Sequence, residues 1–202
     1  MADVVNSHLF NGETLMNQFQ DLVKFINKLF AGAIESPLTI TLGDEFQGVV
    51  NAPSNAVAIV FAMEEWIVEN QWDFKLRYVI VEGIIDTEIN KDSAHEMLGE
   101  GLTRARTQLG FMKKESNRFY ISLEDQALSS KLTKALHLAQ HFIDGWQPKD
   151  RETVAGFLKG LNYKELAAKL GKDDSSVWRR RKSLAIDSYE TCKSLTEELL
   201  DG

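Results

Sequence analysis

The sequence predicts an α+β fold followed by a small all-helical module. Apolar residues recur at helical spacing in some segments and alternate in others, in the order β-α-β-β-α-β-α-β-α up to residue 146. A hairpin between two helices is typical of a sheet with helices over its face. A turn signal and a change of composition in DGWQPKDRE divide the chain into a first domain, 1–146, and a second, 147–202.

Each element of the first domain has its own signal. A face of regularly spaced apolar residues predicts a helix over 13–31, and Pro53-Ser54 begins a second helix that reaches about Asn70. Alternation on both sides of Gly43-Asp44-Glu45 predicts a tight hairpin. The strands are expected at 2–5, 38–42, 46–50, 74–85 and 117–122. A loop that enters a helix is expected at 99–114, and a further helix at 123–146.

The segment MADVVNS has the character of the end of a strand. A central strand usually carries apolar residues before an acid such as Asp3. We therefore expect a few residues upstream of Met1.

Length, charge and cysteine content narrow the class of protein. The 202 residues are enough for one well-filled core, and the net charge of −7 disfavours a general nucleic-acid coating protein. No apolar run reaches the roughly 18 residues of a membrane span, and no basic-then-apolar signal peptide opens the chain. A single cysteine, Cys192, excludes an internal disulfide and suits a reducing cytoplasm, so we expect a cytoplasmic protein without membrane contact.

Three helices are predicted in the second domain. The first covers 153–161, and the second covers 163–170 with Asn162 as its cap and Gly171 at its end. The third follows the turn GKDDSSV and runs to about Leu200. Its apolar stripe, which we expect to pack within the chain rather than on a second chain, contains Ala185, Tyr189, Cys192, Leu195 and Leu199.

Acids at a strand end and at a hairpin tip are candidate metal ligands. Asp3 and Asp44 would meet at one edge of the sheet if their strands are neighbours, and Gly43 permits the backbone geometry of the tip. Glu45 is either a third ligand or turned to the other face. Mg²⁺ and Mn²⁺ prefer such oxygen ligands. The alternative is that these acids serve turn chemistry alone.

The same residues resemble a known fold. ADVVNS followed by ITLGDEFQG resembles the paired motifs of the class III nucleotidyl cyclase and diguanylate cyclase (GGDEF) palm, and LRYVIVEGII, GEGLTRAR and RFYIS resemble its later elements. The resemblance implies a ferredoxin-like palm domain in which Asp3 and Asp44 bind metal and Gly43 and Arg106 contact nucleotide. It departs at Leu102, where a cyclase has a ribose-orienting asparagine, and no catalytic residue is assigned.

The pattern YKELAAKLG followed by SSV resembles helix-turn-helix modules of the sigma-factor region-four type. In such modules the third helix enters the major groove of DNA. The resemblance implies DNA contacts, to bases and then to phosphates, by Ser175, Ser176, Trp178, Arg179, Arg180, Arg181 and Lys182. The alternative is a three-helix packing unit whose arginines are solvated.

Taken together, the whole chain resembles the SatD family, a poorly characterised bacterial group. We expect a DNA-binding transcriptional regulator, acting as a homodimer, whose palm domain binds a nucleotide with Mg²⁺ or Mn²⁺. The alternatives are a nucleotidyl cyclase or related magnesium-dependent nucleotidyltransferase, and a degenerate palm that serves only for dimerisation.

Other chemical signals are discounted. His137 and His141 share a helix face but have neither a third ligand nor the glutamate of a zinc motif. Cys192 has no basic partner nearby in the sequence, which disfavours a nucleophile. Glu64 and Glu65 are expected to be solvent-facing or to make local contacts.

Overall fold

The protein, seen here in a computed structural model that describes residues 1–201, is built on a five-stranded sheet in the order β2-β3-β1-β4-β5. β1 is antiparallel to both β3 and β4, β2 and β3 form the predicted hairpin, and β4 and β5 are parallel. The mixed α+β fold is therefore confirmed. The strand bounds are β1 Ala2–Val4, β2 Ile34–Ile40, β3 Glu45–Val50, β4 Leu76–Val81 and β5 Phe119–Ser122.

One strand begins earlier than expected. β2 includes Pro37, although the prediction began after it. Proline lacks the backbone N–H that a central strand must donate, but β2 is the edge strand of the sheet, where this loss is tolerated.

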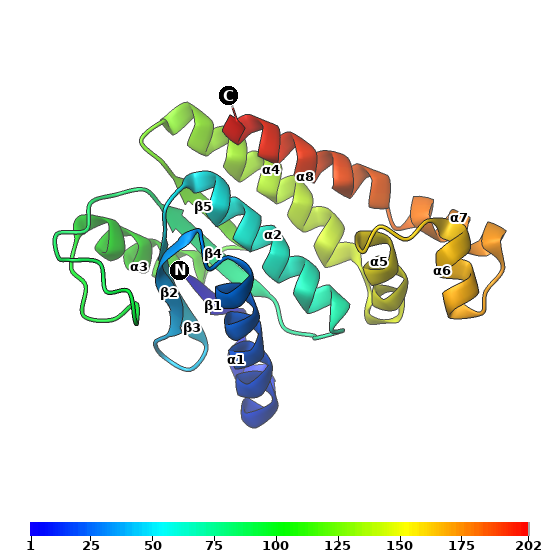
Figure 1. Ribbon diagram of the computed structural model, residues 1–202, viewed down its shortest axis with the longest axis horizontal. Coiled ribbons are helices and arrows are strands. Elements are labelled where there is room, and N and C mark those ends of the chain that lie inside the picture. Colours follow the sequence, from blue (N-terminus) through cyan, green and yellow to red (C-terminus); the bar gives the residue numbers. More distant parts are fainter. Residues whose placement is uncertain (202) are drawn as a thin grey trace.

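Helices cover both faces of the sheet (Figure 1). α1 and α2 lie over one face, α4 lies against β5, and α3 packs on β4. No helix within residues 1–201 is both long and apolar enough to cross a bilayer. The bounds are α1 Gly12–Leu29, α2 Pro53–Glu69, α3 Glu100–Met112, α4 Gln126–Gly145, α5 Arg151–Leu158, α6 Tyr163–Leu170, α7 Asp174–Ser183 and α8 Ile186–Asp201, with short 3₁₀ turns at Ser7–Leu9 and Pro148–Asp150.

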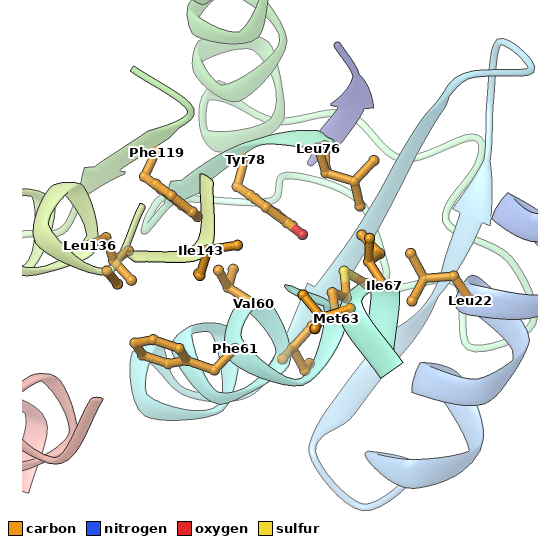
Figure 2. Packing of buried hydrophobic residues seen from close by; sticks show 14 of the residues in the cluster. Leu22, Val60, Phe61, Met63, Ile67, Leu76, Tyr78, Phe119, Leu136 and Ile143 are labelled. Atoms are coloured by element: carbon orange, nitrogen blue, oxygen red, sulfur yellow. The ribbon is translucent and has the colours of Figure 1, made fainter. Parts of the chain in front are cut away.

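Alternation along β4 divides the core between the two faces. Leu76 and Tyr78 belong to the large core cluster with α1 and α2, whereas Val79 joins a smaller cluster with Leu109 of α3. Figure 2 shows Tyr78 directed from the sheet toward Val60 and Met63 of α2. The sheet is therefore covered on both sides near β4.

Local sequence signals explain where several helices begin and end. The Asn162 side chain accepts the N–H groups of Lys164 and Glu165 at 2.9 and 3.1 Å, and Glu165 returns a bond to the Asn162 N–H, so a capping box begins α6. α6 ends at Gly171, whose φ of 62° suits glycine. The predicted caps of the second short helix are therefore confirmed.

The prediction that the third helix of the second domain continues to Leu200 is wrong. α7 stops at Ser183, Ala185 has a φ of 52°, and α8 is a separate helix. The break lets α8 turn back and pack on α4 and α2, and Figure 1 shows it running beside α4. Tyr189 and Cys192 are buried there as expected, but Leu195 is 49% exposed and lies off the packed face.

Contacts join the predicted second domain closely to the first. The Trp146 indole N–H donates to the Leu184 carbonyl at 2.9 Å, and the Tyr189 hydroxyl donates to Glu65 at 2.9 Å. The stripe therefore packs within the chain, and one apolar core extends across the predicted boundary. The division at residue 147 stays a prediction.

A buried ion pair connects α2 to the sheet and to α4. The Arg118 guanidinium donates two hydrogen bonds of 2.9 Å to Glu64, one of 2.5 Å to the Leu76 carbonyl and one of 3.0 Å to Asp144. Glu64 and Arg118 are 3% and 4% exposed. Burial alone would lower the pKa of Arg118, but attraction to Glu64 and Asp144 outweighs it and raises that pKa, so the arginine stays charged.

The expectation that Glu64 faces solvent or makes only local contacts is therefore wrong. Glu64 meets Arg118, which is 54 residues away in the sequence. Glu65 is also engaged over long range, because it accepts from Tyr189 and from Lys193 at 2.7 Å. Glu64 falls in the helical spacing of Val57, Val60 and Phe61, but this periodicity carries no information on which distant residue it contacts.

Replacing Arg118 by methionine should lower the free energy of unfolding by about 3–5 kcal/mol, because Glu64 is left as a buried, uncompensated charge. Urea unfolding measures the loss. Arg179→Met, on the exposed side of α7, is the control and should change stability by no more than about 0.5 kcal/mol. The double variant Glu64→Leu/Arg118→Met should lose less than Arg118→Met; an equal loss would show that charge pairing is not the cause.

Cys192 should react with a disulfide reagent such as dithionitrobenzoate only when α8 opens. Its thiol is buried, donates to the Ala135 carbonyl at 3.3 Å, and has a pKa raised by burial. We expect the thiol to react about two orders of magnitude or more slowly in native buffer than in denaturing urea. In native buffer only the small fraction of molecules in which α8 is open can react. Reaction as fast as that of glutathione would contradict the packing of α8.

Candidate functional site

The central strand β1 is shorter than the two strands that flank it. Ala2 lies opposite Phe46 of β3 and Tyr78 of β4, and Met1 exchanges backbone hydrogen bonds of 2.9 and 2.8 Å with Val79. Beyond Met1, β3 continues to Val50 and β4 to Val81. We call the space between residues 48–50 and 80–81 the strand gap.

The strand gap opens into a cavity of about 260 Å³. Its walls are the second half of β3, the first turns of α2, the second half of β4 and the start of α3. Tyr78 and Val60 line it on the α2 side, whereas Val79 and Ala105 line it on the α3 side. The cavity therefore passes through the sheet, and most of its lining is apolar.

Two glycines bring the start of α3 close to the end of β4. A Cβ atom on Gly83 would lie 2.8 Å from the Gly101 Cα, closer than real Cβ atoms approach. Gly101 also donates its N–H to the Ile84 carbonyl at 3.1 Å. This close approach places Leu102 in the wall of the cavity. The residue that departs from the cyclase pattern is thus part of an apolar surface.

The predicted acids lie on neighbouring strands but have protein partners. Asp3 is buried opposite Glu45, and its carboxylate meets Arg77 at 2.8 Å and Lys113 at 3.4 Å. Burial raises the pKa of Asp3, although both cations act to lower it. Asp44 accepts the Ser7 hydroxyl at 2.5 Å.

Asp3 and Asp44, together with Glu45, are the residues that were predicted to bind a metal ion. Within residues 1–201, no group of three histidine, cysteine, aspartate or glutamate side chains is placed to hold a metal ion. Glu45 is buried and lies 3.3 Å from the Thr41 hydroxyl. The assignment of Asp3, Asp44 and Glu45 to Mg²⁺ or Mn²⁺ stays a prediction.

The two predicted nucleotide-contacting residues lie apart from the strand gap. Gly43 is at the hairpin tip with a φ of 82°, which confirms its expected conformation. Arg106 donates to the Gln47 side chain at 2.9 Å, and Gln47 in turn donates to the Ala94 carbonyl. Neither residue lines the cavity, and their contact with a nucleotide stays untested.

Much of the positive charge on α7 is paired within the chain. Arg180 forms an ion pair with Asp150, and Arg181 lies 2.7 Å from Asp187. The Lys182 ammonium lies 4.2 Å from the centre of the Trp178 ring. Acids of the same chain therefore already compensate charges that the sequence assigned to DNA phosphates.

The other residues assigned to DNA lie near the start of α7. Ser175 donates to Asp173 at 2.6 Å, and the Ser176 N–H donates to the same carboxylate at 3.0 Å, so both belong to the helix cap. Arg179 is exposed. Helices α5 and α6 occupy the expected positions and α7 begins where expected, but these positions do not establish a helix-turn-helix.

The strand gap is the feature that sequence reasoning missed. Arg77 and Lys113 were also missed. A charged residue inside the apolar run LRYVIV is a signal of a buried partner, since an isolated charge is rarely buried.

Comparison with known proteins gives a family match along almost the whole chain. The model described as "SatD family" matches residues 1–200. A curated relative from Latilactobacillus sakei subsp. sakei (strain 23K), named 2,3-bisphosphoglycerate-dependent phosphoglycerate mutase 2, is 27% identical over 155 residues. That match covers 72% of this chain and 55% of the relative, so the chain spans about half the length of the curated relative. No solved structure matches significantly.

The expected function is wrong on these findings. The family match and the mutase-named relative support neither a DNA-binding transcriptional regulator nor a nucleotidyl cyclase or nucleotidyltransferase. The resemblances to a palm and to a region-four module rested on short motifs, whereas the family match extends over residues 1–200. The internal pairing of Arg180 and Arg181 agrees with this correction.

The buried position of Asp3 predicts an unusual pH dependence. Because its pKa is raised above the usual 3.8, Asp3 contributes its full stability, relative to asparagine, below that value and loses it as the pH rises through the folded pKa. Asp3→Asn should therefore destabilise the protein more at about pH 4 than at about pH 7. Urea unfolding of both proteins across this range checks the sign.

Asp21→Asn, on the exposed side of α1, is the control for that measurement. Its effect should stay small throughout the range. A destabilisation by Asp3→Asn that grows with pH would mean that attraction to Arg77 outweighs burial.

Proposed function

The chain belongs to the SatD family, and for this member we propose a binding function in which the cavity lined by β3, β4, α2 and α3 takes an apolar ligand. The observation that carries the proposal is the cavity of about 260 Å³ that passes through the sheet between β3 and β4. Ligand sites are typically concave and mostly apolar, with a few polar groups that orient the ligand. Here Asn51 and Glu82 supply polar groups in the lining.

The walls of the strand gap are well supported from behind. Val60 and Met63 belong to α2, which the Arg118–Glu64 ion pair connects to the sheet. Leu102 and Ala105 belong to α3, whose start is held against Gly83. A cavity with such walls keeps its shape without a ligand, which lowers the entropic cost of binding.

A phosphoryl-transfer function, suggested by the name of the curated relative, has less support. Histidine is a common carrier of phosphoryl groups in enzymes. None of His8, His95, His137 and His141 lines the cavity, and all four are exposed. We therefore base the proposal on binding rather than on catalysis.

We also propose finer structural assignments. Residues 1–146 would form a ferredoxin-like domain of the palm type. The strand order supports this, because β1 is central, with the β2–β3 hairpin on one side and β4 on the other. Residues 147–202 would form a helix-turn-helix-shaped packing unit, supported by the caps of α6 and α7. The predicted homodimer stays a prediction.

Filling the cavity should abolish binding of an apolar probe. We expect anilinonaphthalene sulfonate to bind the native chain with enhanced fluorescence, and Ala105→Leu to weaken this binding by about tenfold or more, since the new side chain occupies the gap. Ala168→Leu, on the exposed side of α6, is the matched control and should leave binding unchanged.

Circular dichroism and urea unfolding establish that both variants are folded. Ala56→Leu, on the α2 wall, provides a second test if Ala105→Leu is destabilised. Native probe binding by both folded variants would contradict the proposal.

A further inference from the structure

We propose that a second pocket, between α3 and β5, binds a small phosphate monoester, with Arg104 as the residue that holds the phosphate group. This α3–β5 pocket has a volume of about 230 Å³ and is formed by the end of β4, one flank of α3 and the second half of β5. It shares only Val81 with the apolar cavity described above. The inference therefore goes beyond the apolar binding function and does not depend on it.

The pocket exists because α3 covers β4 but leaves β5 beside it. α3 packs on β4, where Leu109 is buried against Val79. β4 and β5 are parallel neighbours, with Val79 opposite Tyr120 and Val81 opposite Ser122. Strand alternation turns these four residues to the same face of the sheet, so Tyr120 and Ser122 form the floor of a groove along the helix.

The side chains around this groove are polar. Residues three and four apart on a helix share a face, and this spacing brings four polar residues of α3 to the flank that borders β5. They are Thr103, Arg104, Thr107 and Gln108. The Thr103 hydroxyl already donates to the Gly99 carbonyl at 3.2 Å. Together with β5, the lining carries one positive charge, no carboxylate and several hydrogen-bond donors, which favours an anion.

A buried hydroxyl orients the one charged group of the lining. Ser122 is 6% exposed, and its oxygen accepts a hydrogen bond of 2.8 Å from Nη2 of Arg104. This bond uses one of the five N–H donors of the guanidinium. Because the serine oxygen is the acceptor, its own hydrogen is left to donate to a ligand. Arg104 and Ser122 therefore act as a pair that faces the pocket.

The number of donors and the size of the pocket select the ligand. A guanidinium fork matches two oxygens of either a carboxylate or a phosphate. Here Thr107, Gln108 and Tyr120 add donors beyond those that the two oxygens of a carboxylate require. A phosphate monoester carries about −1.5 to −2 charges at pH 7 and three strong acceptor oxygens. The volume is below the roughly 300–1,000 Å³ of pockets for drug-sized ligands, so the esterified part is small.

One acid of the chain competes for Arg104. The Glu100 carboxylate lies 3.8 Å from Nη1 of Arg104, which is beyond hydrogen-bond distance, and its side chain is 70% exposed. Exposed pairs of this kind are weak, so a phosphate dianion can displace the carboxylate. Removing the charge of Glu100 should therefore strengthen binding.

The test is titration of the full, ¹⁵N-labelled chain with glycerol 3-phosphate, followed by amide chemical shifts. We expect saturable shifts in residues 103–108 and 120–122. Arg104→Gln should weaken binding about tenfold or more, because a charge-assisted contact is lost. Arg179→Gln, an exposed arginine of α7, is the matched control and should leave binding unchanged. Absence of saturable shifts in the native chain, or equal binding by Arg104→Gln, would overturn the inference.

Two further variants test the charge of the pocket. Glu100→Gln should tighten binding about twofold to fivefold, whereas Glu197→Gln, on the exposed side of α8, should not. Thr107→Glu places a carboxylate in the lining at an exposed helical position and should abolish binding even if Arg104→Gln does not fold. Circular dichroism establishes folding, and native affinity in folded Thr107→Glu would contradict the proposal.

Other probes define the chemical class. Glycerol 3-phosphate should bind more tightly than inorganic phosphate or succinate. Equal affinity for inorganic phosphate would make the free ion the ligand, and equal affinity for succinate would make it a carboxylate; either result would overturn the monoester. Arg104→Gln should leave the fluorescence of bound anilinonaphthalene sulfonate unchanged, because the apolar cavity does not include Arg104. Parallel loss of both ligands would overturn the claim of a separate site.

Discussion

The ion pair between Glu64 and Arg118 is the interaction on which the layered structure depends. One guanidinium contacts α2, the Leu76 carbonyl of β4 and Asp144 of α4, so a single side chain sets the spacing of the helices over the sheet. Its hydrogen bonds offset the cost of burying charge only while all partners stay in place. The α2 wall of the strand gap is part of this arrangement, because Val60 and Met63 lie on the same helix as Glu64.

Much of the fold could be predicted because its signals are local. Asn162 and Gly171 define the ends of α6 by hydrogen bonds within a few residues, and the Gly43 tip defines the hairpin. The pairing of Glu64 with Arg118 could not be predicted, because nothing near either residue indicates its partner. The break at Ala185 was missed for a similar reason: an alanine with positive φ is held by packing of α8 rather than by its own preference.

The candidate site was predicted less well than the fold. Motif resemblance directed attention to Asp3, Asp44 and the arginines of α7, which the structure pairs with Arg77, Ser7 and acids of the same chain. The cavity is lined by residues of β3, β4, α2 and α3, which no single motif brings together. Leu102, which was noted only as a departure from the motif, lines the cavity.

The position of α8 has a consequence for synthesis of the protein on the ribosome. α8 is made after every element that it covers, yet Tyr189 and Cys192 complete the packing over α2 and α4. A nascent chain that has already formed the sheet therefore presents an uncovered apolar surface until α8 emerges. Such surface invites contact with other nascent chains or with chaperones, so the late arrival of one helix determines how long this vulnerable period lasts.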